Sequence, residues 1–307
     1  MIRTDRLADA RSERPVVLAI GVFDGLHLGH QAILTAAIQE AARLGGKAWV
    51  LTFGPHPARL LRPAQAPLQL CTDAQRGLLV EAMGIDGCIV LPFTRDLAEL
   101  QPRRFWDLLR AAIPTLAAIS VGANWRFGQQ ASGDIESLRE FGRADGVRIL
   151  VPEAVLHVGE PVSSTRIRRA VQEGDLESAA LMLGRPYSLA GEVVHGKKLG
   201  RTMGFPTLNV KTVNECVPPA GVYAAKVWVG DRCHYGAGYR APGGTASGDA
   251  RVLFEVHLLD FQGDLYGRKV EVALVKRMRA PLPPDQVPDL AARIRADVES
   301  VRAYFSH

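Results

Sequence analysis

The chain has 307 residues, of which 47% are hydrophobic and 22% are charged, and its formal net charge is +5 at pH 7. This is the composition of an ordinary soluble protein, and no apolar stretch is long enough to span a membrane. The length exceeds what one core usually holds, so two domains are expected. The positive charge suits polyanionic ligands, nucleotides as well as nucleic acids, and does not choose between them.

The cysteines and the first residues indicate the compartment. Cys71, Cys88, Cys216 and Cys233 stand apart, with no Cys-x-x-Cys spacing, which favours reduced thiols over disulfides. Residues 1–14 are charged and lack the apolar core of a signal peptide. We therefore expect a cytoplasmic protein.

A turn rich in glycine and histidine follows the first expected strand. Residues 15–20 are apolar, residues 21–31 read Gly-Val-Phe-Asp-Gly-Leu-His-Leu-Gly-His-Gln, and apolar residues recur at helical spacing from 33 to 41. A glycine turn that opens a helix offers backbone N–H groups and a positive dipole end to a phosphate. His27 and His30 are three apart and share a helix face. Such a pair could also be plain polar surface or, less favourably, part of a zinc site.

Strand and helix patterns alternate from residue 47 to residue 151. The strands are expected at 47–53, 87–91, 116–121 and 147–151, and the helices at 73–83, 102–113 and 134–143. Alternation of this kind predicts an α/β fold with a doubly wound parallel sheet, whose ligands gather beyond the carboxyl ends of the strands. His56, in a Gly-Pro-His-Pro turn, lies at the same edge as the histidine turn, although it could be a turn residue with no role.

Two further motifs follow in the first half. The loop Gly-Ala-Asn-Trp-Arg-Phe-Gly at 122–128 either packs on itself or forms an aromatic wall for a planar ring system. Val-Ser-Ser-Thr-Arg-Ile-Arg-Arg at 162–169 opens a helix that we expect to run to about Leu183, with Ser163 and Ser164 as N-caps. Arginines at the positive end of a helix make sense if an anion sits there, and a solvated basic turn is the alternative.

The composition changes near Arg185, so the expected domains are residues 1–184 and 185–307. Short strand patterns separated by turns predict a small antiparallel β-barrel in the second domain, with an amphipathic C-terminal helix at 290–305. The strands are expected at 189–195, 222–229, 234–238, 252–259 and 269–275.

Two stretches of the second domain carry candidate chemistry. In residues 196–209, three glycines and three cations precede Phe-Pro-Thr-Leu-Asn. Such a loop can cradle a polyphosphate, while Thr207 and Asn209 offer neutral oxygen ligands for Mg²⁺; many basic glycine loops are only mobile turns. Glu255 faces away from its apolar strand neighbours, as a solvated carboxylate or as a functional one.

These motifs, in this order, resemble those of the bacterial bifunctional riboflavin kinase/FAD synthetase family over roughly residues 15 to 300. The resemblance implies that the second domain phosphorylates riboflavin to FMN with ATP, and that the first joins FMN to AMP from a second ATP to give FAD and pyrophosphate. It implies Mg²⁺ as cofactor, ATP as co-substrate, and riboflavin, FMN and FAD as the other ligands. We expect a monomer or weak homo-oligomer with no membrane and no nucleic-acid partner, since the cations cluster at phosphate motifs without an aromatic platform.

The resemblance assigns roles by motif position. The catalytic residues are His27, His30 and Glu255. The residues that bind ATP in the adenylyltransferase domain are Gly21, Phe23, Asp24, Gly29, Ser164, Thr165, Arg166 and Arg168. Those that bind flavin there are His56, Asn124, Trp125, Arg126 and Phe127. Those that bind ATP in the kinase domain are Gly196, Lys197, Gly200, Arg201, Gly204, Pro206, Thr207 and Asn209, and the metal is assigned to Thr207 and Asn209.

The chain departs from the family pattern in three places. Trp125 stands where phenylalanine is usual, residues 236–244 replace an Asn-Ile-Gly-x-Arg-Pro-Thr-like stretch, and residues 277–283 keep an arginine but lose a glutamate and a Lys-Phe pair. One alternative is therefore a diverged paralogue that nucleotidylates another flavin-like phosphate, with weak or lost kinase activity. Another is a basic nucleic-acid-binding protein or a flavin-binding regulator without turnover.

Overall fold

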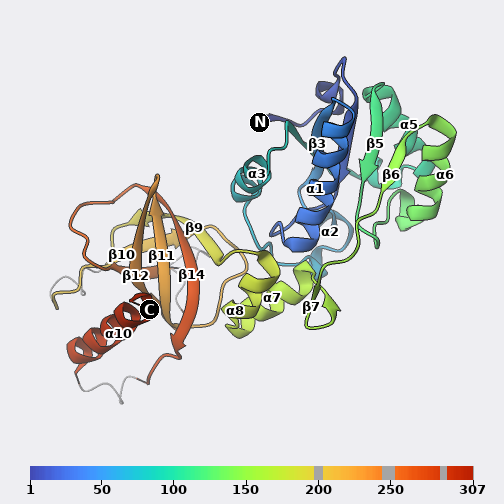
Figure 1. The fold of residues 1–307 in the computed structure, drawn as a ribbon. Helices are drawn as coiled ribbons and strands as arrows, with labels where there is room; N and C mark the ends of the chain where they lie inside the picture. The colour runs from blue at the N-terminus through green and yellow to red at the C-terminus, as the bar shows by residue number, and fades with distance from the viewer. Residues whose placement is uncertain (197–202, 244–252, 284–288, 307) are drawn as a thin grey trace. The chain divides into compact units, whose positions relative to one another are not determined.

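A computed structural model describes residues 1–196, 203–243, 253–283 and 289–306 (Figure 1). The chain packs as two compact units, one of residues 1–67 and 73–163 and one of residues 68–72 and 164–307. No disulfide joins any of the four cysteines, all of which lie in the described ranges. None of the helices in these ranges has the length and apolar character needed to cross a membrane.

Residues 1–163, all of them described, contain a parallel sheet of six strands in the order β1-β4-β3-β2-β5-β6. The strands are β1 (Ile2–Thr4), β2 (Val16–Ile20), β3 (Lys47–Gly54), β4 (Gly87–Pro92), β5 (Leu116–Ser120) and β6 (Arg148–Leu150). The chain builds β2, β3 and β4 outward on one side and then returns to place β5 on the other side of β2. The topological switch point therefore lies between β2 and β5, where ligands of such sheets bind.

Helices cover both faces of this sheet, as predicted. The α-helices of residues 1–163 are α1 (Leu28–Arg43), α2 (Pro57–Leu61), α3 (Asp73–Ala82), α4 (Arg95–Glu99), α5 (Pro102–Ala112) and α6 (Ile135–Asp145). Successive residues of β2 point to opposite faces: Val16, Leu18 and Ile20 pack with residues of α5 and α6, while Val17 and Ala19 pack with residues of α1. A strand buried on both faces explains the continuous apolar run at 15–20.

The second unit contains a closed barrel with the strand order β10-β13-β12-β11-β14-β9, every neighbouring pair antiparallel. The strands are β9 (Tyr187–Val194), β10 (Leu208–Thr212), β11 (Gly221–Val229), β12 (Arg232–Arg240), β13 (Leu253–Leu258) and β14 (Lys269–Arg279). Tyr223 and Phe254 fill its interior, with ring centroids 5.7 Å apart. The C-terminal helix α10 (Leu290–Phe305) packs on β11 and β12 from outside (Figure 1). The α/β sheet followed by a small barrel and a helix confirms the predicted fold class.

The helix expected from residue 162 to Leu183 is in fact two helices, α7 (Ser164–Glu173) and α8 (Leu176–Leu183). Gly174 takes a left-handed conformation with φ of 83°, and Asp175 restarts the helix by accepting a hydrogen bond from the N–H of Ser178 at 3.0 Å. The single long helix was wrong because an apolar pattern runs through this break. The expected end near Leu183 is confirmed, and Gly184 follows it as a left-handed C-cap.

Other elements were not predicted. They are β1, β10, α2, α4, the hairpin of β7 (Leu156–His157) and β8 (Glu160–Pro161), and the 3₁₀ helices η1 (Leu7–Ala10), η2 (Pro63–Gln65) and η3 (Gln129–Ala131). Packing groups α7 and α8 with the barrel. The division into functional domains between residues 184 and 185 was inferred from the change in composition, and it stays a prediction.

Candidate active sites

Buried side chains hold the conformation of the turn between β2 and α1. Phe23 and Leu26 have positive φ angles of 53° and 38°, which non-glycine residues rarely adopt, and Gly25 between them has 79°. Phe23 and Leu26 are nonetheless almost fully buried, so their packing holds this conformation. A Cβ on Gly21 would lie 3.0 Å from the ring of Phe23. Glycine at 21 therefore lets that ring pack against the backbone where β2 ends.

His27 and His30 form a stacked pair at the start of α1. Their ring centroids are 3.6 Å apart at 16°, and the Phe23 ring makes a T-shaped contact with His30. His27 is the N-cap of α1, its Nδ1 accepting the backbone N–H of His30 at 3.2 Å. Because Nδ1 accepts there, the hydrogen of the neutral ring is on Nε2, which can donate. Gly29 makes the arrangement fit, since a Cβ on it would lie 3.2 Å from the His27 ring.

A cavity of about 880 Å³ lies in the first unit, along the carboxyl edge of the sheet. Trp125 and Phe127 form part of its wall, with stacked rings whose centroids are 4.5 Å apart at 15°. Gly21 and Val22 reach it from the end of β2. The volume and the flat aromatic wall suit a planar heterocycle. The cavity is also lined by residues that the sequence did not predict, among them Phe53, Leu60, Phe93, Leu97 and Phe105.

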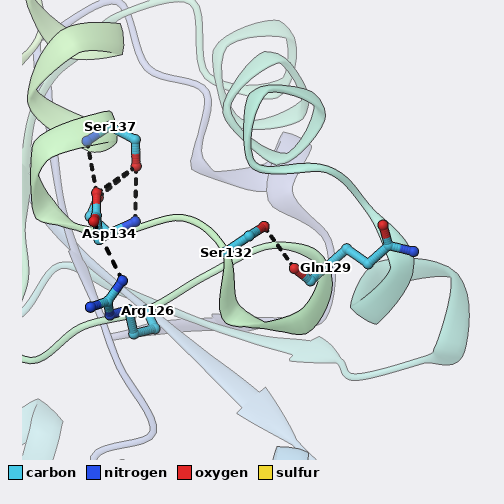
Figure 2. A network of polar contacts seen from close by, with 5 residues as sticks. All are labelled: Arg126, Gln129, Ser132, Asp134 and Ser137. Carbon is cyan, nitrogen blue, oxygen red and sulfur yellow. Dashed lines mark hydrogen bonds and ion pairs between the residues drawn. The ribbon is translucent and has the colours of Figure 1, made fainter.

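Arg126, another lining residue, is tied to the start of α6 (Figure 2). Its Nη1 lies 3.4 Å from Oδ2 of Asp134, the N-cap of α6. Asp134 and Ser137 form a capping box, with each side chain bonded to the backbone N–H of the other. The N–H of Ser137 is the main reason that the pKa of Asp134 is lowered. The carboxylate thus stays charged and orients the guanidinium.

Two residues assigned to flavin, His56 and Asn124, are not among the described residues that line this cavity. His56 is the N-cap of α2, and its Nδ1 accepts the N–H of Ala58 at 3.1 Å. Asn124 is exposed. His27 and His30 are not among the lining residues either. The site roles of these residues stay predictions.

The Ser-Ser-Thr-Arg motif straddles the division between the two units. Ser163 is the last residue grouped with the first unit, and α7 begins at Ser164 in the second. Within the second unit, Nε of Arg168 donates to the carbonyl of Leu68 at 2.7 Å. The predicted contacts of α7 with the triphosphate of ATP stay a prediction.

The barrel unit has a cavity of its own, of about 450 Å³. Pro206, Thr207 and Asn209, all predicted, line it at the start of β10. The cavity is also lined by a segment for which the sequence predicted no role, namely Phe261, Gln262, Gly263, Asp264, Leu265 and Tyr266. Oδ1 of Asp264 accepts the N–H of Tyr266 at 2.9 Å, which closes this turn.

Asn209, Glu255 and Tyr239 form a row across three strands. Asn209 on β10 is opposite Glu255 on β13, which is opposite Tyr239 on β12, so the three side chains share one face. It is the outer face, since the alternate β13 residues Phe254 and Val256 are buried inside the barrel. Glu255 does not line the described cavity but lies directly beside Asn209, which does. Burial raises the pKa of Glu255, which strengthens a carboxylate as a proton acceptor.

The glycine loop is described only in part. Lys197, Gly200 and Arg201 lie outside the described residues. Gly196 packs against the side chain of Asn209, because a Cβ on Gly196 would lie 2.4 Å from the amide atoms. Gly204 has a φ of 85°, and no atom of the described residues, its two chain neighbours aside, lies within 4 Å of where its Cβ would be.

Two family models match this chain, one in each half. The model of the FAD synthetase family matches residues 9–166, and that of the riboflavin kinase family matches residues 183–305. The chain is 35% identical to a bifunctional riboflavin kinase/FMN adenylyltransferase of Listeria monocytogenes, over 99% of this chain and 96% of the relative. It is 34% identical to the protein of that name from Escherichia coli K12, over 94% and 92%. The chain belongs to the bifunctional riboflavin kinase/FMN adenylyltransferase family.

A solved structure agrees on the fold. The crystal structure titled as a macrolide-efflux protein from Streptococcus pneumoniae matches 98% of both chains, with a TM-score of 0.86 and 28% identity. The histidine turn and the larger cavity lie in the part of the chain that matches the FAD synthetase family. Thr207, Asn209, Glu255 and the smaller cavity fall in the part that matches riboflavin kinase.

Proposed function

We propose that this chain carries out both reactions of its family, each in one of the two predicted domains. Residues 185–307 phosphorylate riboflavin to FMN with ATP, and residues 1–184 adenylylate FMN to FAD with release of pyrophosphate. The observation that carries the proposal is that each family-matched part has a separate cavity lined by residues of its own motifs. ATP is the co-substrate of both steps.

In the kinase step, a hydroxyl oxygen of the ribityl chain bonds to the γ-phosphorus of ATP, and the bond from that phosphorus to the ADP oxygen breaks. Glu255 takes the hydroxyl proton, and the pKa raised by its burial supports this role. Thr207 and Asn209 present neutral oxygens on the cavity wall. Such oxygens fit a Mg²⁺ ion bound mainly by nucleotide phosphates, which would neutralise charge on the transferred group.

In the adenylylation step, an FMN phosphate oxygen bonds to the α-phosphorus of ATP while the bond to pyrophosphate breaks. A phosphate is already a nucleophile, so the site supplies alignment and charge stabilisation rather than a base. The stacked pair supports this role, because Nε2 of His27 carries the donor hydrogen. We assign charge stabilisation at the α-phosphate to His27 and His30, and pyrophosphate to Arg166 and Arg168.

The larger cavity is proposed to hold the isoalloxazine ring of FMN against Trp125 and Phe127. Trp125 replaces the usual phenylalanine with a larger aromatic, and its stacking on Phe127 supports an unchanged use of the wall. No finding favours a diverged paralogue. A monomer or weak homo-oligomer in the cytoplasm, without a nucleic-acid partner, stays the expectation.

The decisive experiment separates the two steps by product. Purified full-length protein is incubated with riboflavin, ATP and Mg²⁺, and the flavins are separated by chromatography over time. FMN should appear first and FAD after it, and a second reaction started with FMN should yield FAD directly. Omission of ATP or addition of a chelator controls for carried-over flavin. A protein that forms neither FMN nor FAD would overturn the proposal.

A further inference from the structure

His257 lies two residues after Glu255 on β13 and shares its outward face. Its Nδ1 is 2.9 Å from the carbonyl oxygen of Pro206. The His257 ring also makes a T-shaped contact with Phe205, with centroids 5.6 Å apart at 80°. A carbonyl oxygen only accepts, so Nδ1 must carry the hydrogen.

The contact stands where the strand pairing ends. Pairing of β10 with β13 begins at Leu208 and Val256, so the preceding residues lie outside the ladder. Pro206 has no N–H and cannot extend a ladder in any case. The hydrogen bond from the side chain of His257 therefore holds this segment to β13 where backbone pairing is absent. It fixes the turn that leads into Thr207.

We propose that His257 is a positioning residue of the kinase reaction. By donating Nδ1–H to Pro206 it fixes the turn before β10, and with it the place of Thr207 and Asn209 relative to Glu255. His257 acts through the turn and touches no reacting atom. The proposal rests on the kinase half of the proposed function.

The bond does not depend on the charge of the ring. Neutral His257 with its hydrogen on Nδ1 and the doubly protonated ring both donate from this nitrogen. His257 also lies near Asp260, whose pKa is lowered chiefly by its hydrogen bond with Arg302 and to a smaller extent by His257. A positioning role thus predicts that replacing the ring by a permanent donor leaves the pH profile of the kinase unchanged.

Three variants of the full chain test the donor and its place. In His257→Asn the amide nitrogen can take the place of Nδ1, in His257→Gln the same amide is carried one methylene further out, and His257→Ala has no donor. The readout is kinase kinetics with MgATP and riboflavin varied separately. Conversion of added FMN to FAD by the same protein samples is the internal control.

We expect His257→Ala and His257→Gln to lower kcat/KM for MgATP about tenfold, the loss typical of one hydrogen bond. The KM for riboflavin and the adenylylation of FMN should stay as in the parent, and His257→Asn should recover most of the loss with the parent pH profile. If His257→Ala matches the parent, or if Asn and Gln behave alike, the proposal is wrong. If kcat/KM falls equally for riboflavin and for MgATP, His257 has a general structural role and the positioning role is excluded. A parent chain without kinase activity would instead defeat the proposed function itself.

Discussion

Gly196 and Asn209 lie so close that a methyl group on Gly196 would fall 2.4 Å from the amide of Asn209. Asn209 is only 6% exposed and stands directly opposite Glu255 on the neighbouring strand. The glycine before the basic loop thus has a steric function beside any contact with phosphate. It leaves the space in which an amide oxygen can sit beside the proposed base.

Gly196→Ala should therefore impair the kinase and spare the adenylyltransferase. The added methyl must displace the Asn209 amide, and misplacement of about 1 Å at such a site costs roughly tenfold to a hundredfold in rate. Riboflavin phosphorylation and FMN adenylylation are measured on the same sample. Equal activity of variant and parent in riboflavin phosphorylation would show that Asn209 need not stay where it packs.

Glu255→Gln should abolish most FMN formation while added FMN is still converted to FAD. The amide has nearly the shape of the carboxylate but cannot take a proton, and a general base typically contributes a factor of about 10² to 10⁴. Single-turnover formation of FMN checks the chemical step. A variant that keeps the parent rate would remove Glu255 from the role of base.

His27 and His30 should separate into a capping residue and a pure donor. His30→Ala should lower FAD formation by roughly a hundredfold or more, with FMN formation and thermal stability retained. His27→Ala should lose activity and about 1 kcal/mol of stability as well, because its Nδ1 caps α1. His27→Asn keeps a capping oxygen without the Nε2 donor, so it should be stable but slow. Equal loss of both activities in a folded His30 variant would contradict this division of labour.

Trp125→Ala should weaken FMN binding in the adenylyltransferase half. The substitution removes one ring of the stacked pair in the cavity wall, and we expect the KM for FMN to rise about tenfold. Trp125→Phe is the matched control and should stay near the parent value, because it retains an aromatic face. Kinase kinetics should not change in either variant, and an unchanged KM for FMN in Trp125→Ala would remove the ring from the flavin site.

Much of this architecture could be predicted because local patterns carry it. The apolar run before Gly21 predicted a strand, and β2 (Val16–Ile20) lies there; the pattern at residues 47–53 likewise predicted β3 (Lys47–Gly54). The break between α7 and α8 has a local signal, a glycine followed by an aspartate that caps the next helix. It was not predicted because the apolar pattern continues across Gly174.

What could not be predicted depends on contacts between distant segments. Phe53, Phe93 and Phe105 meet at one cavity only because the sheet order brings their elements to one edge. The bond from His257 to Pro206 follows from the register of β10 and β13, which no local pattern specifies. The same holds for the row of Asn209, Glu255 and Tyr239.

Lowering the pH should reduce the stability of the first unit by protonating Glu40, which lies on α1 away from the histidine pair. Its side chain is 8% exposed, and hydrogen bonds from Arg43, with Arg148 nearby, lower its pKa from 4.5 to about 2. A carboxyl whose pKa is lower when folded contributes stability above its unfolded value, and that stability is lost as the pH falls from about 4.5 to about 2. Both arginines are more than half exposed, so solvent screening limits the contribution to about 1–2 kcal/mol. Urea unfolding of parent and Glu40→Gln between pH 7 and pH 3 measures it: the difference between their free energies of unfolding should shrink with falling pH, and a constant difference would exclude titration of Glu40 as its source.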